Sequence, residues 1–61
     1  MTLYFVYGII EGALTDEESF ETVDEAYSFF RELVTQYREL KLDDYYIGIS
    51  DGVDELAYTT R

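Results

Sequence analysis

The chain has 61 residues, with 14 Asp or Glu against 4 Lys or Arg, so its net charge at neutral pH is −10. A chain of this length makes one small domain, residues 1–61, and buries only about 60% of the surface that its unfolded form exposes. It contains no Cys and no His, which excludes disulfides, thiolate metal sites and the commonest general base. Of the usual ways to stabilise a small domain, association with another subunit and binding of a hard cation remain.

The composition predicts a folded domain. Apolar residues make up 48% of the chain, including seven Tyr and four Phe, whereas acidic disordered segments are poor in aromatic residues. The longest apolar run, residues 3–10, is too short to span a membrane and lacks the basic region of a signal peptide. We therefore expect a cytoplasmic protein that does not bind membranes.

The first third of the chain reads as a strand followed by less regular structure. Residues 2–10 are β-branched and aromatic, which is typical of a strand, and residues 11–14 are expected to form a turn. Residues 15–21 have weak strand character. Thr15 followed by Glu18 also fits a capping box, so one helical turn is the alternative there.

Residues 22–40 give the strongest helix signal. Thr22 is a suitable N-cap, and Glu25 completes a capping box. Apolar residues then recur at helical spacing along one stripe. They are Val23, Ala26, Tyr27, Phe30, Leu33, Val34, Tyr37 and Leu40.

Residues 43–60 are predicted to form a β-hairpin. Asp51-Gly52 is a favoured two-residue turn, which places Ile47 opposite Leu56 and Tyr45 opposite Tyr58. A four-residue loop, 51–54, is the alternative and shifts the pairing by two residues. In both registers the same side chains are expected to face inward.

Together these elements predict an α+β fold. One amphipathic helix packs on a small, mainly antiparallel sheet of three or four strands, in the order strand, turn, helix, strand, strand. The first strand is apolar on both faces, with Leu3, Phe5, Tyr7 and Ile9 on one and Tyr4, Val6 and Ile10 on the other. Since one helix covers one face, either the second face carries exposed Tyr and Val or it packs on a partner or a second copy.

The acidic stretch at residues 16–25 needs its own explanation, since six of these ten residues are Asp or Glu. Residues 1–30 hold seven acids and no base, giving −7, and residues 31–61 hold seven acids and four bases, giving −3. Acids in a first helical turn are stabilised by the helix dipole, which accounts for Asp24 and Glu25. It does not account for the absence of Lys and Arg across thirty residues.

Metal binding and catalysis are poorly supported. The calcium-loop pattern is absent, and residues 50–55 carry acids at the wrong spacing. The serines have no His to activate them, and the chain has no glycine-rich phosphate loop and no basic patch. We expect no enzymatic activity, no cofactor and no specific metal site.

An acidic surface that binds protein is the preferred interpretation. Such a charge repels nucleic acid and attracts a basic protein surface, so we expect a partner from a nucleic-acid-binding complex and no direct contact with nucleic acid. The candidate binding residues are Asp16, Glu17, Glu18, Glu21, Asp24 and Glu25, followed by Asp43 and Asp44. In size, charge and aromatic content the chain resembles small acidic inhibitors encoded by phages and mobile elements, such as anti-CRISPR and anti-restriction proteins that act as DNA mimics. The resemblance implies an inhibitor that works in the host cytoplasm.

The alternative is a salt-adapted structural or accessory domain that acts as a homodimer or a subunit. Its acids would be solvated and would carry no information about a ligand. Salt adaptation should spread acids over every exposed face, whereas a mimic should concentrate them on one face and leave another free of charge.

Overall fold

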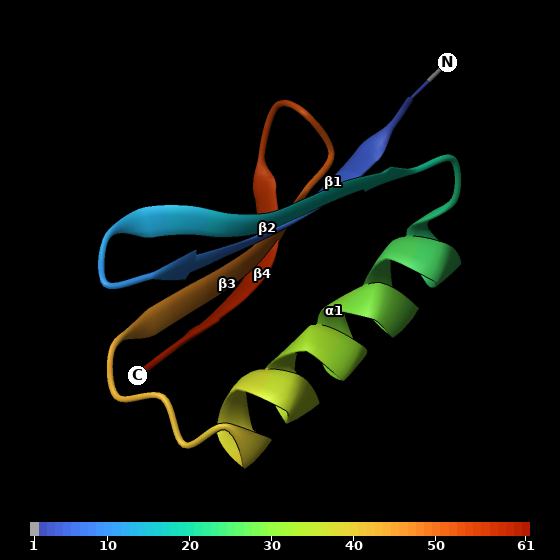
Figure 1. Cartoon of the computed structure of the whole chain (residues 1–61). Coiled ribbons are helices and arrows are strands. Elements are labelled where there is room, and N and C mark those ends of the chain that lie inside the picture. The colour runs from blue at the N-terminus through green and yellow to red at the C-terminus, as the bar shows by residue number, and fades with distance from the viewer. Residues whose placement is uncertain (1) are drawn as a thin grey trace.

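The computed structural model describes residues 2–61, which form one helix on a four-stranded antiparallel sheet (Figure 1). The elements are β1 (Tyr4–Ile10), β2 (Ala13–Phe20), α1 (Val23–Glu39), β3 (Tyr45–Ser50) and β4 (Glu55–Thr60). The strands lie in the order β2-β1-β3-β4, so β1 and β3 are central and β2 and β4 are the edges. The predicted α+β class is confirmed, and the sheet has the larger of the two predicted strand numbers.

A tight hairpin joins β1 to β2, and here the prediction of a longer turn was wrong. Glu11 and Gly12 both have positive φ, 51° and 81°, as a two-residue type I′ turn requires. Residues 13–20 are therefore all strand, and no helical turn begins at Thr15. The Thr15 hydroxyl instead donates to the Gly8 carbonyl at 3.1 Å, at the point where a bulge shifts the β1–β2 register.

The helix was predicted to within a residue at each end. Thr22 is the N-cap, and its hydroxyl accepts a hydrogen bond from the Glu25 backbone N–H at 3.3 Å. The same hydroxyl donates to Glu25 Oε1 at 2.8 Å, so the side chain of Glu25 reaches the cap hydroxyl. Acids in this first turn also complement the helix dipole.

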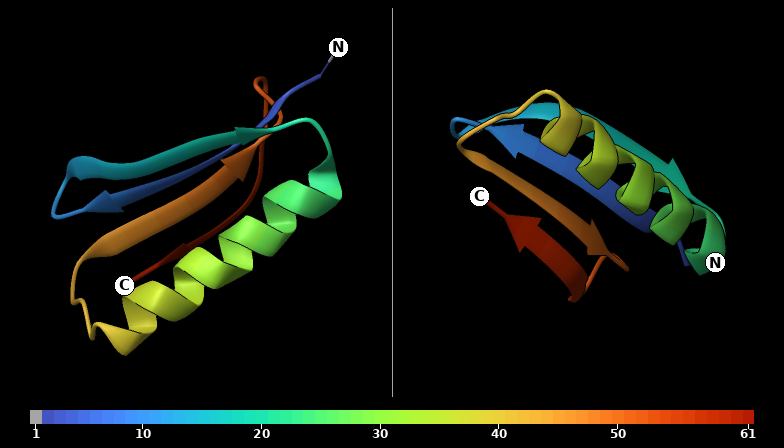
Figure 2. Two further views of the ribbon diagram at one scale, coloured as in Figure 1. Left: turned by 45° about the vertical axis from the view of Figure 1, so that its right-hand side comes forward. Right: turned by 90° about the horizontal axis from the view of Figure 1, so that it is seen from below.

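The core lies between α1 and one face of β1 and β3. Its buried residues are Val6, Ala26, Leu33, Tyr37, Tyr45, Ile47 and Ile49. The helix runs across β1 and β3 and reaches part of β2, while β4 lies farthest from it (Figure 2). The predicted stripe was wrong at its C-terminal end, because Leu40 is 68% exposed. It also missed Phe29, whose ring centroid lies 5.3 Å from that of Phe20 on β2.

The β3–β4 hairpin has the four-residue loop, 51–54, so the alternative is confirmed and the prediction of a two-residue turn was wrong. A bulge beside Ser50 adds a further shift, so Ile49 pairs with Ala57 and Ile47 with Thr59. A shift of one residue exchanges the two faces of a strand. The predicted inward face of β4 was therefore wrong, and Tyr58 is 63% exposed on the side away from the helix.

Within residues 2–61, α1 is the single helix, and it is neither long nor apolar enough to span a lipid bilayer.

Candidate protein-binding surface

The predicted acidic residues fall into two groups at different places in the fold. Six of them follow the edge strand β2 and the start of α1: Asp16, Glu17, Glu18, Glu21, Asp24 and Glu25. Asp43 and Asp44 lie in the loop before β3, where the Asp44 carbonyl accepts a hydrogen bond from the Glu11 N–H at 3.0 Å. The length of α1, about 25 Å at ~1.5 Å per residue, separates this loop from the helix start.

The three consecutive acids of β2 alternate between the two faces of the sheet. Glu17 pairs with Tyr7 and lies on the face away from α1, whereas Asp16 and Glu18 pair with Gly8 and Val6, which face the helix. An edge strand that carries charge is protected against pairing with other strands. These acids therefore have a structural role in addition to any binding role.

Asp16 in particular is part of the fold. The Tyr37 hydroxyl donates to Asp16 Oδ2 at 2.6 Å and lies 3.0 Å from the Thr15 hydroxyl. Burial of the ring, followed by the hydrogen bond to Asp16, raises the pKa of Tyr37 above its ordinary value. Asp16 is thus the least available of the six candidates for contact with a partner.

The sheet face away from α1, which we call the open face, is covered by no other element of residues 2–61. It is formed by alternate residues of the four strands, which include Phe5, Tyr7, Ile9, Glu17, Tyr46, Gly48, Glu55 and Tyr58. The prediction that strand 1 is apolar on both faces is correct for Phe5, Tyr7 and Ile9. Its aromatic side chains, half-buried at Phe5, Tyr7 and Tyr46 and exposed at Tyr58, are of the kind that is enriched in contacts between proteins.

Three tyrosines form a stack across β1, β3 and β4 on the open face. The rings of Tyr7 and Tyr46 have centroids 6.3 Å apart and an interplanar angle of 12°. Those of Tyr46 and Tyr58 are 5.6 Å apart and inclined by 5°. Gly48 makes this possible, because a Cβ there would lie 2.5 Å from the ring of Tyr7. The absence of a side chain at Gly48 lets Tyr7 lean across β3.

Glu55 holds two of these rings in place. The hydroxyl of Tyr46 donates to its Oε1, and the hydroxyl of Tyr7 donates to its Oε2. These two bonds, that from Tyr46 first, lower the pKa of Glu55. The hydrogen bond to Glu55 is also the largest cause that raises the pKa of Tyr46 to about 12, whereas burial is the main cause of the raised pKa of Tyr7.

The sequence prediction missed Tyr46, Tyr58 and Glu55 as site residues. The apolar second face of strand 1 was a signal for Tyr7, and the alternation of β3 gives Tyr46. The outward position of Tyr58 depends on the bulge in β4, which residue pattern alone does not reveal. Glu55 precedes the bulge and lies on the open face in either predicted register, but its bonds to two tyrosines could not be predicted.

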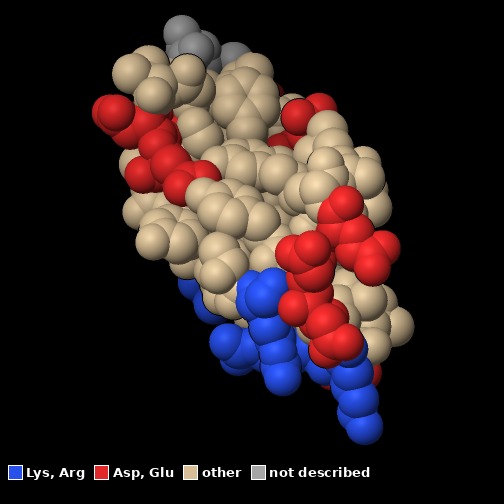
Figure 3. Space-filling view, turned by 90° about the vertical axis from the view of Figure 1, so that its left-hand side faces the viewer, with Lys and Arg blue, Asp and Glu red and all other residues tan. Residues whose placement is uncertain are grey.

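Charge is unevenly distributed on the surface. Seen from the left-hand side of Figure 1, an uncharged band is bordered by Asp and Glu on two sides, and Lys and Arg gather at its lower end (Figure 3).

The side chain of Asp51 takes part in the 51–54 loop. Its Oδ1 accepts hydrogen bonds from the N–H groups of Val53 and Asp54 at 2.9 and 2.8 Å. These backbone bonds lower the pKa of Asp51.

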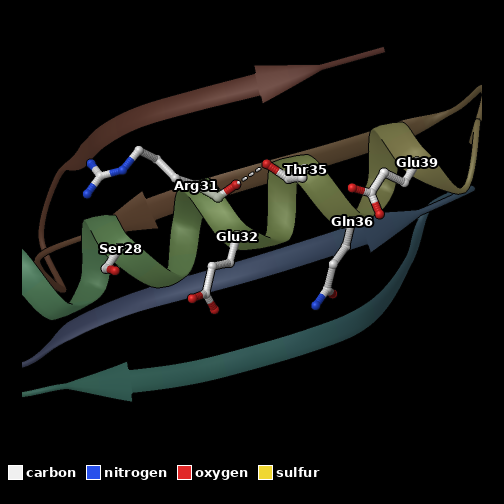
Figure 4. A pocket seen from close by; sticks show the side chains of 6 residues that line it. All are labelled: Ser28, Arg31, Glu32, Thr35, Gln36 and Glu39. Atoms are coloured by element: carbon white, nitrogen blue, oxygen red, sulfur yellow. Dashed lines mark hydrogen bonds between the residues drawn. The ribbon is translucent and has the colours of Figure 1, made fainter.

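The hollows of the surface are shallow. One lies on the outer side of α1, where Ser28, Arg31, Glu32, Thr35, Gln36 and Glu39 point to solvent (Figure 4). The one bond drawn there, from the Thr35 hydroxyl to the Arg31 carbonyl at 3.0 Å, stays within the helix. No group of three or more metal-binding side chains is found among residues 2–61.

No protein-family model matches this chain, and comparisons with curated proteins and with solved structures find no match.

Proposed function

We propose that this domain binds a protein through a basic surface of that protein and inhibits a complex that handles DNA or RNA. The observation that carries the proposal is the arrangement of the open face. The half-buried tyrosines Tyr7 and Tyr46 lie on the central strands between Glu17 on one edge strand and Glu55 on the other, and the exposed Tyr58 lies on the same edge strand as Glu55.

The acidic edge supports a partner that normally binds phosphate. Glu17 lies on the open face of the edge strand β2, and Glu18 lies on its other face. This edge therefore presents negative charge on both sides of the sheet, with no Lys or Arg on β2. A groove that binds phosphate through Lys and Arg would be attracted to such an edge.

The tyrosines support a specific contact in addition to long-range attraction. Charge complementarity raises the rate of encounter and suppresses wrong partners, but affinity comes mainly from a few well-packed anchors, and Tyr is among the commonest. Tyr58 is 63% exposed and belongs to an ordered stack. Little side-chain entropy remains to be lost when a partner covers it.

The proposal is tested by capture and competition. The protein is immobilised, exposed to a nuclease-treated bacterial lysate, and washed with duplex DNA. We expect the captured proteins to be nucleic-acid-binding and to be displaced by DNA, because both ligands would occupy the same basic surface.

A matched pair of charge reversals serves as the control. Glu17→Lys with Glu21→Lys changes the proposed surface, and Glu32→Lys with Glu39→Lys makes the same change in net charge on the exposed outer side of α1. Capture should be lost with the first pair and kept with the second. Capture that DNA does not displace, or that both pairs weaken equally, counts against a nucleic-acid mimic.

One observation favours the alternative of a salt-adapted accessory domain or homodimer. Acids also occur outside the proposed surface, at Glu32 and Glu39 on α1 and at Asp43 and Asp44 near the opposite end. A spread of this kind is expected where acids maintain solubility in high salt. Under that alternative, both pairs of reversals would leave partner binding unchanged.

A further inference from the structure

We propose that the outer edge of β4, together with the groove between β4 and α1, binds an extended acidic segment of a partner protein. The segment pairs antiparallel to β4 as a further strand of the sheet, and its carboxylates bind Arg31 and Arg38. This binding is independent of the proposed function, because it uses a positively charged surface at another place in the fold.

A shallow groove of about 340 Å³, which we call the β4 groove, lies between α1 and β4. It is present because α1 packs on the other three strands and leaves the helix side of β4 largely uncovered (Figure 2). Phe30 and Val34, which are half-buried at the margin of the core, and Thr59 of β4 line it. Arg31 and Arg38 also line it, so an apolar floor carries positive charge within a chain whose net charge is −10.

The two arginines are placed to bind a ligand of the opposite charge. They lie seven residues apart on α1, about 10 Å along its axis at ~1.5 Å per residue, and both are exposed. Neither has an acid three or four residues away with which it could form an ion pair on the helix. Arg31 points toward the side of β4, whereas Glu32 and Gln36 point toward the side of β2 (Figure 4). Because guanidinium binds carboxylate through parallel N–H donors, this side of α1 favours an acidic ligand.

The outer edge of β4 offers backbone groups to a further strand. Tyr45 and Arg61 exchange both of their backbone hydrogen bonds at 2.9 Å. In the alternating pattern of an antiparallel pair, Tyr58 and Thr60 therefore direct their N–H and C=O groups away from β3, and no strand of residues 2–61 lies beyond β4. Unlike β2, which has three consecutive acids, β4 has one charged residue, at its start. This edge thus lacks the charge that protects β2 from pairing.

The edge and the arginines together specify the ligand. Residues directly opposite in an antiparallel pair share a face, so the residues that bond Tyr58 and Thr60 lie on the open face, and those between them lie on the helix side near the arginines. A segment with acids at every second position meets both requirements. Main-chain bonds then provide affinity and the alternate side chains provide specificity. Nucleic acid could contact the two arginines, but it has no repeating peptide groups to match the edge.

The test uses a short peptide that alternates Glu with Thr. Its control has equal length and charge and alternates Glu with Pro, so that the residues opposite Tyr58 and Thr60 have no N–H to donate. Binding to the full chain is followed by NMR at about 0.15 M salt, where a Debye length of about 8 Å limits repulsion by distant acids. We expect the Glu-Thr peptide to slow hydrogen exchange at the amides of Tyr58 and Thr60, and the Glu-Pro peptide to bind several-fold less tightly.

A pair of substitutions tests the arginines. Arg31→Gln with Arg38→Gln should weaken binding of the Glu-Thr peptide roughly fivefold, as the loss of two exposed ion pairs would give. Lys41→Gln with Arg61→Gln is the matched control, because it removes the same charge from the two bases that do not line the β4 groove. This second pair should weaken binding less.

The proposal is overturned if the Glu-Thr peptide does not bind at millimolar concentration, if both peptides bind equally, or if the two pairs of substitutions have equal effects. It is also overturned if a single-stranded oligonucleotide binds the β4 groove as tightly as the peptide, which would show recognition of charge alone. Slower exchange at Tyr58 and Thr60 on concentrating the protein by itself would make a second copy the occupant and would overturn it as well. Each of these results leaves the proposed function intact, because the acidic surface takes no part.

Discussion

The hydroxyl of Tyr37 donates a hydrogen bond of 2.6 Å to Asp16 and thereby ties the last turns of α1 to the edge strand β2. Tyr37 is only 3% exposed, so this bond lies at the margin of the core. It also separates Asp16 from the other acids of its stretch, because reversal of this charge would damage the fold. Binding experiments on the acidic edge are better made at Glu17 and Glu21.

Tyr37→Phe should lower the free energy of unfolding by about 1–2 kcal/mol, because it removes a hydrogen bond to a charged, partly buried group. Chemical denaturation checks the value. Tyr27→Phe, at a half-buried tyrosine of the same helix, is the control and should lower the free energy of unfolding by less. If the two substitutions cost the same, the Tyr37–Asp16 bond adds nothing to stability.

Stability should fall in alkaline solution. The pKa values of Tyr7, Tyr37 and Tyr46 are raised in the folded state above the ordinary value of 10.0. A group whose folded pKa is raised gives its full contribution below the unfolded pKa and loses it as pH rises through the folded pKa. Thermal unfolding should therefore be insensitive to these groups up to about pH 10 and shift to lower temperature above it.

A pH titration of the tyrosines tests the role of Glu55 directly. The pKa of Tyr46 is raised to about 12, and the hydrogen bond to Glu55 is the largest cause of this rise. In Glu55→Gln, tyrosinate absorbance should show Tyr46 ionising at lower pH, closer to an ordinary tyrosine. An unchanged titration curve would mean that the carboxylate does not hold the ring in solution.

How much of this fold could be predicted from sequence depends on the element. The helix followed from the 3.6-residue period and the Thr22 cap, both of which are local signals. The strand β2 was predicted only weakly, over residues 15–21, because Asp and Glu are poor strand formers and its pairing is fixed by the Glu11-Gly12 turn and by β1.

The candidate site was harder to predict than the fold. The acidic residues were visible in the sequence, but which of them share a surface depends on the alternation of β2 and on the length of α1. The outward position of Tyr58 depends on one extra residue in β4. A bulge of this kind exchanges the faces of a strand without changing its composition.

Gly48→Ala should disrupt the stack while leaving the core in place. The added Cβ would lie 2.5 Å from the ring of Tyr7, so Tyr7 must move away from β3 and from Glu55. We expect a loss of about 1–3 kcal/mol of stability, as for other overpacked sites. NMR spectra should change at Tyr7, Tyr46 and Tyr58 and remain similar for Leu33. A spectrum that changes throughout would indicate general unfolding, and an unchanged one would show that Tyr7 does not lie over Gly48.

Self-association should depend on salt. Two copies with a charge of −10 each repel one another at low ionic strength, and screening reduces this repulsion. We expect a monomer at low salt and, under the homodimer alternative, a growing dimer fraction at high salt, measured by light scattering after size exclusion. Tyr58→Lys on the open face should then suppress the dimer. A strict monomer at every salt concentration contradicts that alternative.

The most direct measurement of the central claim is the rate at which the domain associates with a captured nucleic-acid-binding partner, followed by surface plasmon resonance over a series of salt concentrations. For the unmodified protein, association should slow steeply as salt rises, because long-range attraction is screened. The Glu17→Lys, Glu21→Lys pair should slow association several-fold at low salt and flatten the salt dependence, whereas the Glu32→Lys, Glu39→Lys pair should change it much less. An association rate that does not depend on salt, or that both pairs leave unchanged, would contradict the account of an acidic surface that binds a basic partner.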